Sequence, residues 1–171
     1  MVGALLMRLC LLRADPQDLP TSPVLLALAL AAHLVLDVLT LLDAYSPARS
    51  LVGATVDTLL LIAVVHTTLL LRNLGHRTIQ TLTALAFVGA IFSAVASLAT
   101  ITLGTWIPAV AVWGAVLLWY LVVFGHIARH ALSLSFPAGV AIALGYFLLS
   151  VVVTGSVMGE PDLSVPGPNG Q

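Results

Sequence analysis

This chain of 171 residues is 60% hydrophobic and only 8% charged, with a formal net charge of −1 at pH 7. A soluble domain carries about 25% charged residues, so this composition excludes an ordinary water-soluble protein and fits one that is embedded in a lipid bilayer. Nucleic acid as a partner needs clustered positive charge, which this balance argues against. Every cation is an arginine, and with the abundant Ala, Leu and Val this usage is typical of a GC-rich bacterial genome.

The pattern of apolar residues over 1–13 predicts a short amphipathic helix. Leu5, Leu9 and Leu12 recur on one side, whereas Arg8 points elsewhere. At about 20 Å this helix is too short to cross a bilayer, so we expect it to lie in the interfacial plane. Cys10, the single cysteine, is expected to pack as a small hydrophobic residue. Residues 14–23 predict a polar linker that is broken by prolines.

Five apolar stretches follow, each about long enough to span a bilayer. No Asp, Glu, Lys or Arg lies between Arg77 and Arg129, and this run must hold two spans that are separated by the Gly-Thr-Trp-Ile-Pro segment at 104–108. The chain is therefore predicted to be an all-α integral membrane bundle over residues 24–157, with a disordered Gly/Pro-rich tail at 158–171. The predicted spans cover residues 24–42, 51–71, 81–103, 109–124 and 137–157.

Arginine placement predicts the orientation of these spans. Five arginines fall on the side of the N-terminal segment and of the second and fourth connections, and only Arg49 falls on the other side. The positive-inside rule then predicts a cytoplasmic N-terminus and a periplasmic C-terminus in a bacterial inner membrane. The five residues on the first side are Arg8, Arg13, Arg72, Arg77 and Arg129.

Three polar residues inside the apolar spans form a candidate intramembrane site. Asp37 and Asp57 are each expected about 8–9 Å from the outer end of their helices, and the short connection makes these helices neighbours. His33 lies one turn deeper than Asp37 on the same face. A charge in hydrocarbon costs roughly 2.5–3.5 kcal/mol, so these groups are expected to share a proton, to pair, or to be reached by water. They form either a proton relay or cation site, or a hydrogen-bonded pair that fixes helix register.

A second polar cluster of histidines and arginines is predicted on the cytoplasmic side. The i, i+4 spacing of His126 and His130 can place two imidazoles around a metal ion. No third ligand at a fixed spacing is evident, so the sequence predicts neither a metal site nor a cofactor, and contact with lipid headgroups is the commoner role. The cluster comprises His66, His76, Arg77, His126, Arg129 and His130.

Small residues in the third span predict close helix packing. Gly89, Ser93 and Ser97 recur at every fourth position, a spacing that lets two helices approach closely. The stripe predicts either packing within the bundle or the seam of a homo-oligomer.

Three segments resemble a group of uncharacterised proteobacterial inner-membrane proteins. They are QDLP at 17–20, GHRTIQTLTAL at 75–85 and WYLVVFGHIARHAL at 119–132. That group is similar in layout to the Yip-domain family, which has a cytoplasmic N-terminal segment and five spans. The resemblance implies an architecture over roughly residues 5–157 and carries over no catalytic residue.

No enzyme motif is present: there is no G-x-S-x-G, no H-E-x-x-H and no phosphate loop. We therefore expect a non-enzymatic multi-pass protein that acts as a scaffold or assembly factor, with the lipid bilayer and either a second copy or another membrane protein as partners. The alternative is a small transporter or a protein that handles protons or cations through His33, Asp37 and Asp57. A third hypothesis is an intramembrane enzyme that uses the same three residues.

Overall fold

A computed structural model of the protein describes residues 2–103 and 106–160, and in this part of the chain all regular structure is helical. Five of the helices are long and apolar enough to cross a membrane, which confirms the predicted all-α bundle and fits a multi-pass membrane protein. They are α2 (Pro23–Leu41), α3 (Pro47–Leu71), α4 (Thr78–Leu103), α5 (Ala109–Leu132) and α6 (Phe136–Met158).

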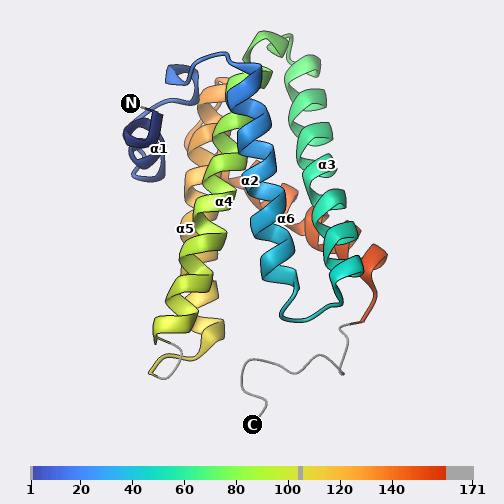
Figure 1. The fold of residues 1–171 in the computed structure, drawn as a ribbon. Helices are drawn as coiled ribbons and strands as arrows, with labels where there is room; N and C mark the ends of the chain where they lie inside the picture. The colour runs from blue at the N-terminus through green and yellow to red at the C-terminus, as the bar shows by residue number, and fades with distance from the viewer. Residues whose placement is uncertain (1, 104–105, 161–171) are drawn as a thin grey trace.

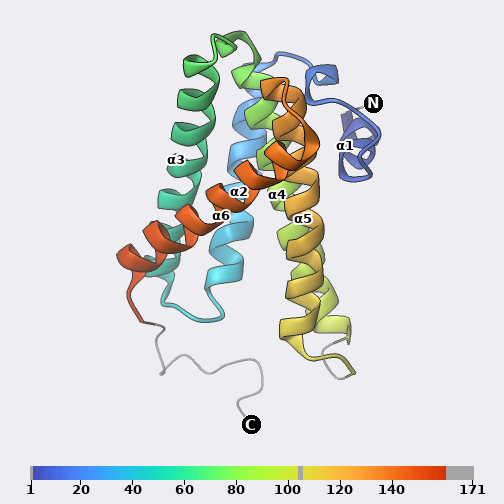
Figure 2. The same cartoon turned by 180° about the vertical axis from the view of Figure 1, so that it is seen from behind.

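The five long helices run alternately up and down, so the chain enters and leaves the bundle at opposite ends (Figure 1). Helix α4 packs against both α2 and α5, and α3 packs against α2. Helix α6 crosses the back of the bundle diagonally and contacts α5 near its start and α3 towards its end (Figure 2). We call the end at which α2 and α4 begin the arginine end, because Arg72, Arg77 and Arg129 lie there, and the opposite end the cavity end.

Prolines mark where three of these helices begin. Helices α2, α3 and α6 each carry a proline in the first turn, a position where its missing N–H breaks no helical hydrogen bond. The Ser22 hydroxyl also accepts a hydrogen bond from the Leu25 N–H at 3.3 Å and caps the start of α2. Helix α3 accordingly begins at Pro47, one turn earlier than the predicted span at residue 51.

Helix α5 continues to Leu132 instead of ending at residue 124, which corrects the expectation of a polar connection from His126 onward. The apolar residues before and after His126 in α5 are buried, and His126 itself is only 3% exposed. The helix ends where Ser133 adopts a left-handed conformation with φ of 55°. The Arg77 guanidinium donates hydrogen bonds to the carbonyls of His130 at 3.0 Å and Ala131 at 3.1 Å, which satisfies acceptors that a helix end leaves without partners.

The N-terminal segment packs against the bundle. Helix α1 (Val2–Cys10) buries Leu6, Leu9 and Cys10 and contacts α4 and α5, while Arg8 stays exposed. The Trp119 indole N–H donates a hydrogen bond to the Cys10 carbonyl at 3.1 Å. Burial raises the pKa of the Cys10 thiol, because desolvation penalises the thiolate, and the residue packs as the expected small hydrophobic group. The helix ends at Cys10, earlier than residue 13, and its place in the interfacial plane stays a prediction.

The predicted linker at 14–23 contains a short 3-10 helix, η1 (Pro16–Asp18), and is fixed to the bundle. The Gln80 amide donates hydrogen bonds to the carbonyls of Gln17 at 2.9 Å and Leu19 at 2.7 Å. The Gln17 amide in turn donates to the His130 carbonyl at 2.9 Å. This segment therefore forms part of the arginine end. The predicted disordered tail falls mainly on residues 161–171, which lie outside the described residues.

Helices α5 and α6 approach each other closely at two glycines. A Cβ atom added to Gly139 would overlap the Gly125 carbonyl oxygen, and one added to Gly125 would meet the Val140 backbone at 2.9 Å. Contacts at such distances with backbone atoms cannot be relieved by a side-chain rotation. These two glycines therefore fix where α6 crosses α5, a contact that the predicted stripe on the third span does not include.

Candidate functional site

The structure brings together the three polar residues predicted inside the spans. The Nε2 atom of His33 lies 3.2 Å from Asp37 Oδ2 and 3.4 Å from Asp57 Oδ2. His33 is 5% exposed, and the side chains of Asp37 and Asp57 are 15% and 20% exposed. A single imidazole thus bridges two nearly buried carboxylates, one on its own helix and one on the next.

Helix geometry explains how the three groups meet. His33 and Asp37 share one face of α2 at the i, i+4 spacing. Asp37 lies about 6 Å along the helix axis from the end of α2, and Asp57 lies about 15 Å from the start of α3. The distances from the helix ends thus differ from the predicted 8–9 Å, because α3 starts earlier than expected, yet both carboxylates reach the same His33 Nε2 atom.

Helix α6 supplies two further partners for Asp57. The Ser150 hydroxyl donates a hydrogen bond to Asp57 Oδ1, and the Tyr146 hydroxyl donates to the same oxygen at 3.4 Å. With His33 Nε2 3.4 Å from Oδ2, the Asp57 carboxylate has polar contacts at both oxygens. Tyr146, which is not among the predicted site residues, is thus part of the site. Because Tyr146 is 89 residues from Asp57 along the chain, no local sequence pattern indicates this contact.

Gly89 on α4 makes room for the His33 ring. A Cβ atom at position 89 would lie 3.0 Å from His33 Nδ1 and 3.1 Å from Cε1. Among the described residues, Nδ1 is a buried ring nitrogen without a hydrogen-bond partner. The predicted small-residue stripe therefore has a local role, because Gly89 holds the imidazole and Ser93 lines the adjoining cavity. Ser97 is half-buried further along α4, and the homo-oligomer seam stays a prediction.

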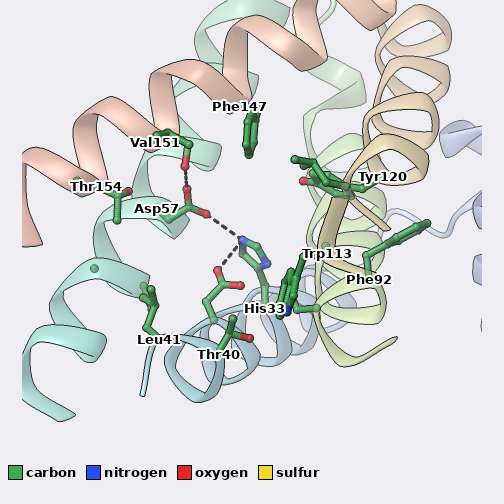
Figure 3. Close-up of a pocket in the computed structure, with 18 of the residues that line it drawn as sticks. His33, Thr40, Leu41, Asp57, Phe92, Trp113, Tyr120, Phe147, Val151 and Thr154 are labelled. Carbon is green, nitrogen blue, oxygen red and sulfur yellow. Dashed lines mark hydrogen bonds and ion pairs between the residues drawn. The ribbon is translucent and has the colours of Figure 1, made fainter. Parts of the chain in front are cut away.

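The trio lines one wall of a partly open cavity of about 460 Å³ at the cavity end of the bundle. All five long helices contribute to it. Figure 3 shows His33 and Asp57 on one side and the rings of Trp113, Tyr120 and Phe147 facing the same space. Its walls are mainly apolar, with a few polar groups that converge, which is the usual composition of a small-molecule site.

A series of aromatic ring contacts runs beside this cavity, which Phe92, Tyr120 and Tyr146 line. Tyr120 lies between Phe92, with ring centroids 5.8 Å apart, and Phe124, at 5.9 Å. Phe124 stacks in turn on Tyr146 at 5.2 Å. Aromatic contacts of this kind are worth about 0.5–1.5 kcal/mol each beyond their buried area. These ring contacts therefore help to fix the positions of α4, α5 and α6 around the trio.

Charge and shape together suit this site to a cation. With His33 protonated and both carboxylates ionised, the trio carries a charge of −1, which is costly in hydrocarbon. A bound cation or one added proton neutralises it. One ligand atom from each residue lies within 4.8 Å of the other two, so the same trio could also hold a metal ion. The electron-rich faces of the neighbouring rings favour a positively charged ligand.

The structure divides the predicted histidine and arginine cluster. His66 and His76 are exposed, on α3 and on the 3-10 helix η2 (Gly75–Arg77) respectively. The Arg129 guanidinium lies over the Phe136 ring, 5.4 Å from its centroid. His126 and His130 come together, with ring centroids 4.6 Å apart, and Arg77 donates a hydrogen bond to the His130 carbonyl.

Comparison of the chain with protein families, with curated proteins and with solved structures gives no match. The resemblance to the Yip-domain family therefore stays a prediction. The function has to be argued from the geometry of the chain itself.

Proposed function

We propose that this chain is a small transporter that binds an organic cation in the cavity beside His33, Asp37 and Asp57 and exchanges it for protons. The observation that carries this proposal is the contact of His33 with both carboxylates, 3.2 and 3.4 Å away, at the wall of a cavity of about 460 Å³. A transporter or cation-handling protein is the alternative to a scaffold that the sequence analysis predicts.

The cavity volume favours an organic cation over a bare ion. Small-molecule sites have volumes of about 300–1,000 Å³, whereas a bare ion needs only its few ligand atoms. The carboxylates of Asp37 and Asp57 would pair with an ammonium group. The rings of Trp113 and Tyr120 would contact its substituents and add cation–π attraction.

Exchange for protons follows from the cost of charge in a membrane. When the organic cation leaves, the trio regains its charge of −1, and one such charge costs roughly 2.5–3.5 kcal/mol in hydrocarbon. A proton taken up on the trio removes this cost. The empty site is therefore protonated and the filled site is not, so movement of the cation in one direction is coupled to movement of a proton in the other.

We propose that the chain lies in a bacterial inner membrane with its N-terminus in the cytoplasm. Arg77 and Gln17 both contact the last turn of α5. These contacts support the proposal that the N-terminal segment, the second connection and the fourth connection lie on the same side of the membrane. These segments hold five of the six arginines. The cavity end then faces the periplasm.

A transport assay tests this function. Purified protein in liposomes with an acidic lumen should take up benzyltrimethylammonium, a permanent cation that does not leak across lipid, while a trapped dye reports a rise in lumenal pH. Accumulation above the external concentration should stop when the pH gradient is removed. Protein-free liposomes and the Asp43→Asn variant, which alters an exposed acid at the cavity end, are the controls.

Uptake no greater than in protein-free liposomes, with either direction of the pH gradient, would exclude the transporter. The scaffold role would then be the better account, and it predicts a membrane protein or a second copy that stays bound through gentle purification. Uptake of Na⁺ or Zn²⁺ alone would exclude the organic cation as substrate.

A further inference from the structure

A second group of possible ligands lies at the arginine end, where the sequence offers two histidines and no third residue at a fixed spacing. Asp15, just before η1, reaches the end of α5, and its Oδ1 atom lies 3.2 Å from His130 Nδ1. His126 is one turn back on the same helix. One ligand atom from each of the three residues lies within 4.8 Å of the other two.

The distances suit a tetrahedral metal ion. Ligand atoms that lie 2.0–2.2 Å from a tetrahedral Zn²⁺ are about 3.3 Å from each other, close to the 3.2 Å between Asp15 and His130. The other separations among the three ligand atoms are at most 4.8 Å, so a bound ion would draw these side chains closer together. Two imidazoles and one carboxylate are ligands that Zn²⁺, Co²⁺ and Ni²⁺ accept.

The surroundings of His126 also resemble those of a metal ligand. Its Nε2 atom lies 3.0 Å from the Ala14 carbonyl, which can only accept, so the neutral ring donates there and keeps its lone pair on Nδ1. Histidine ligands commonly donate their other N–H to a backbone carbonyl in this way. His130 directs its Nδ1 towards the Asp15 carboxylate, 3.2 Å away, and its Nε2 has no hydrogen-bond partner among the described residues.

Exposure and charge give a cation access to this group. The side chain of Asp15 is 48% exposed and that of His130 28% exposed, whereas His126 is buried. Asp18 adds a second carboxylate nearby, because its Oδ2 accepts a hydrogen bond from the Asp15 N–H at 3.0 Å. The group therefore opens to the surface on its acidic side.

We propose that Asp15, His126 and His130 bind one divalent transition-metal ion, with Zn²⁺ as the best fit. The ion ties the N-terminal segment to the end of α5. It does so beside the hydrogen bond from Gln17 to the His130 carbonyl, which already fixes the same two segments. This site is separate from the cavity and does not depend on the proposed transport.

Metal binding by the tag-free, chelator-treated chain in detergent tests this proposal. We expect one Zn²⁺ per chain by elemental analysis after desalting, a higher melting temperature with Zn²⁺, and the visible bands of tetrahedral Co²⁺. His130→Ala should weaken Zn²⁺ binding more than about tenfold, since even loss of an outer-shell partner costs 10–100-fold. Asp15→Asn, which keeps both histidines and α5 intact, should weaken it as well if His130→Ala fails to fold.

Two sets of control variants make the result specific. His66→Ala and His76→Ala remove exposed histidines and should leave Zn²⁺ binding unchanged. Among the described residues, the cavity trio is a second possible group of metal ligands, and Asp57→Asn tests it. This variant should also leave Zn²⁺ binding unchanged. Absence of Zn²⁺ and Co²⁺ binding in the parent chain, or binding that survives Asp15→Asn and His130→Ala, would overturn the proposal.

Discussion

Asp57→Asn is expected to weaken binding of an organic cation strongly while leaving the bundle folded. The change removes the negative charge that Ser150, Tyr146 and His33 hold in place and keeps the size of the side chain. Loss of one partner of a buried charge pair costs about 2–5 kcal/mol, so the affinity for benzyltrimethylammonium should fall by roughly 30-fold or more. Equilibrium binding to purified protein in detergent measures this loss.

The melting temperature separates this outcome from a structural role. A carboxylate in an apolar bundle costs free energy, so its removal should leave the melting temperature unchanged or raise it. Asp43→Asn, an exposed acid in the connection between α2 and α3, is the matched control and should bind as the parent does. Parent-like affinity in both Asp57→Asn and Asp37→Asn would show that the trio only fixes helix register.

Gly139→Ala is expected to give the largest loss of stability. The new methyl group would overlap the Gly125 carbonyl oxygen and would also lie 3.1 Å from the backbone nitrogen of Arg129, so α5 and α6 must move apart. Overpacking costs about 1–3 kcal/mol of stability. Because the contacts here are with backbone atoms, we expect a loss of about 3 kcal/mol. Because α6 carries Ser150 and Tyr146 to Asp57, cation binding should weaken too.

Gly145→Ala is the control, because it lies on the same helix and a Cβ atom there meets nothing within 4 Å. Thermal unfolding in one detergent, followed by circular dichroism, compares the two variants with the parent. We expect Gly145→Ala to unfold at the parental temperature and Gly139→Ala several degrees lower. Equal melting temperatures in the two variants would mean that the crossing of α5 and α6 is not fixed by Gly125 and Gly139.

The features that sequence reasoning recovers are those carried by neighbouring residues. Long apolar runs predict the five helices, and the i, i+4 spacing with a short connection predicts that His33, Asp37 and Asp57 meet. The end of α5 was misplaced because its polar residues resemble a connection. In the fold, burial and the hydrogen bonds from Arg77 let the helix continue through them.

Partners that are distant along the chain could not be predicted. Ser150 and Tyr146 reach Asp57 only because α6 crosses the bundle diagonally, and that crossing depends on the contact between Gly125 and Gly139. Asp15 likewise reaches His130 because the N-terminal segment folds back onto α5. Neither contact leaves a spacing or motif in the sequence, since each depends on how whole helices pack.

Proton release on cation binding tests the central claim most directly. Calorimetric titration of the purified protein with benzyltrimethylammonium, in two buffers of different ionisation enthalpy, counts the protons released. Because the site must stay near neutral, we predict about one proton released per cation bound, and no release in the Asp37→Asn, Asp57→Asn double variant. Binding without proton release, or the same release from the double variant, would contradict exchange at His33, Asp37 and Asp57.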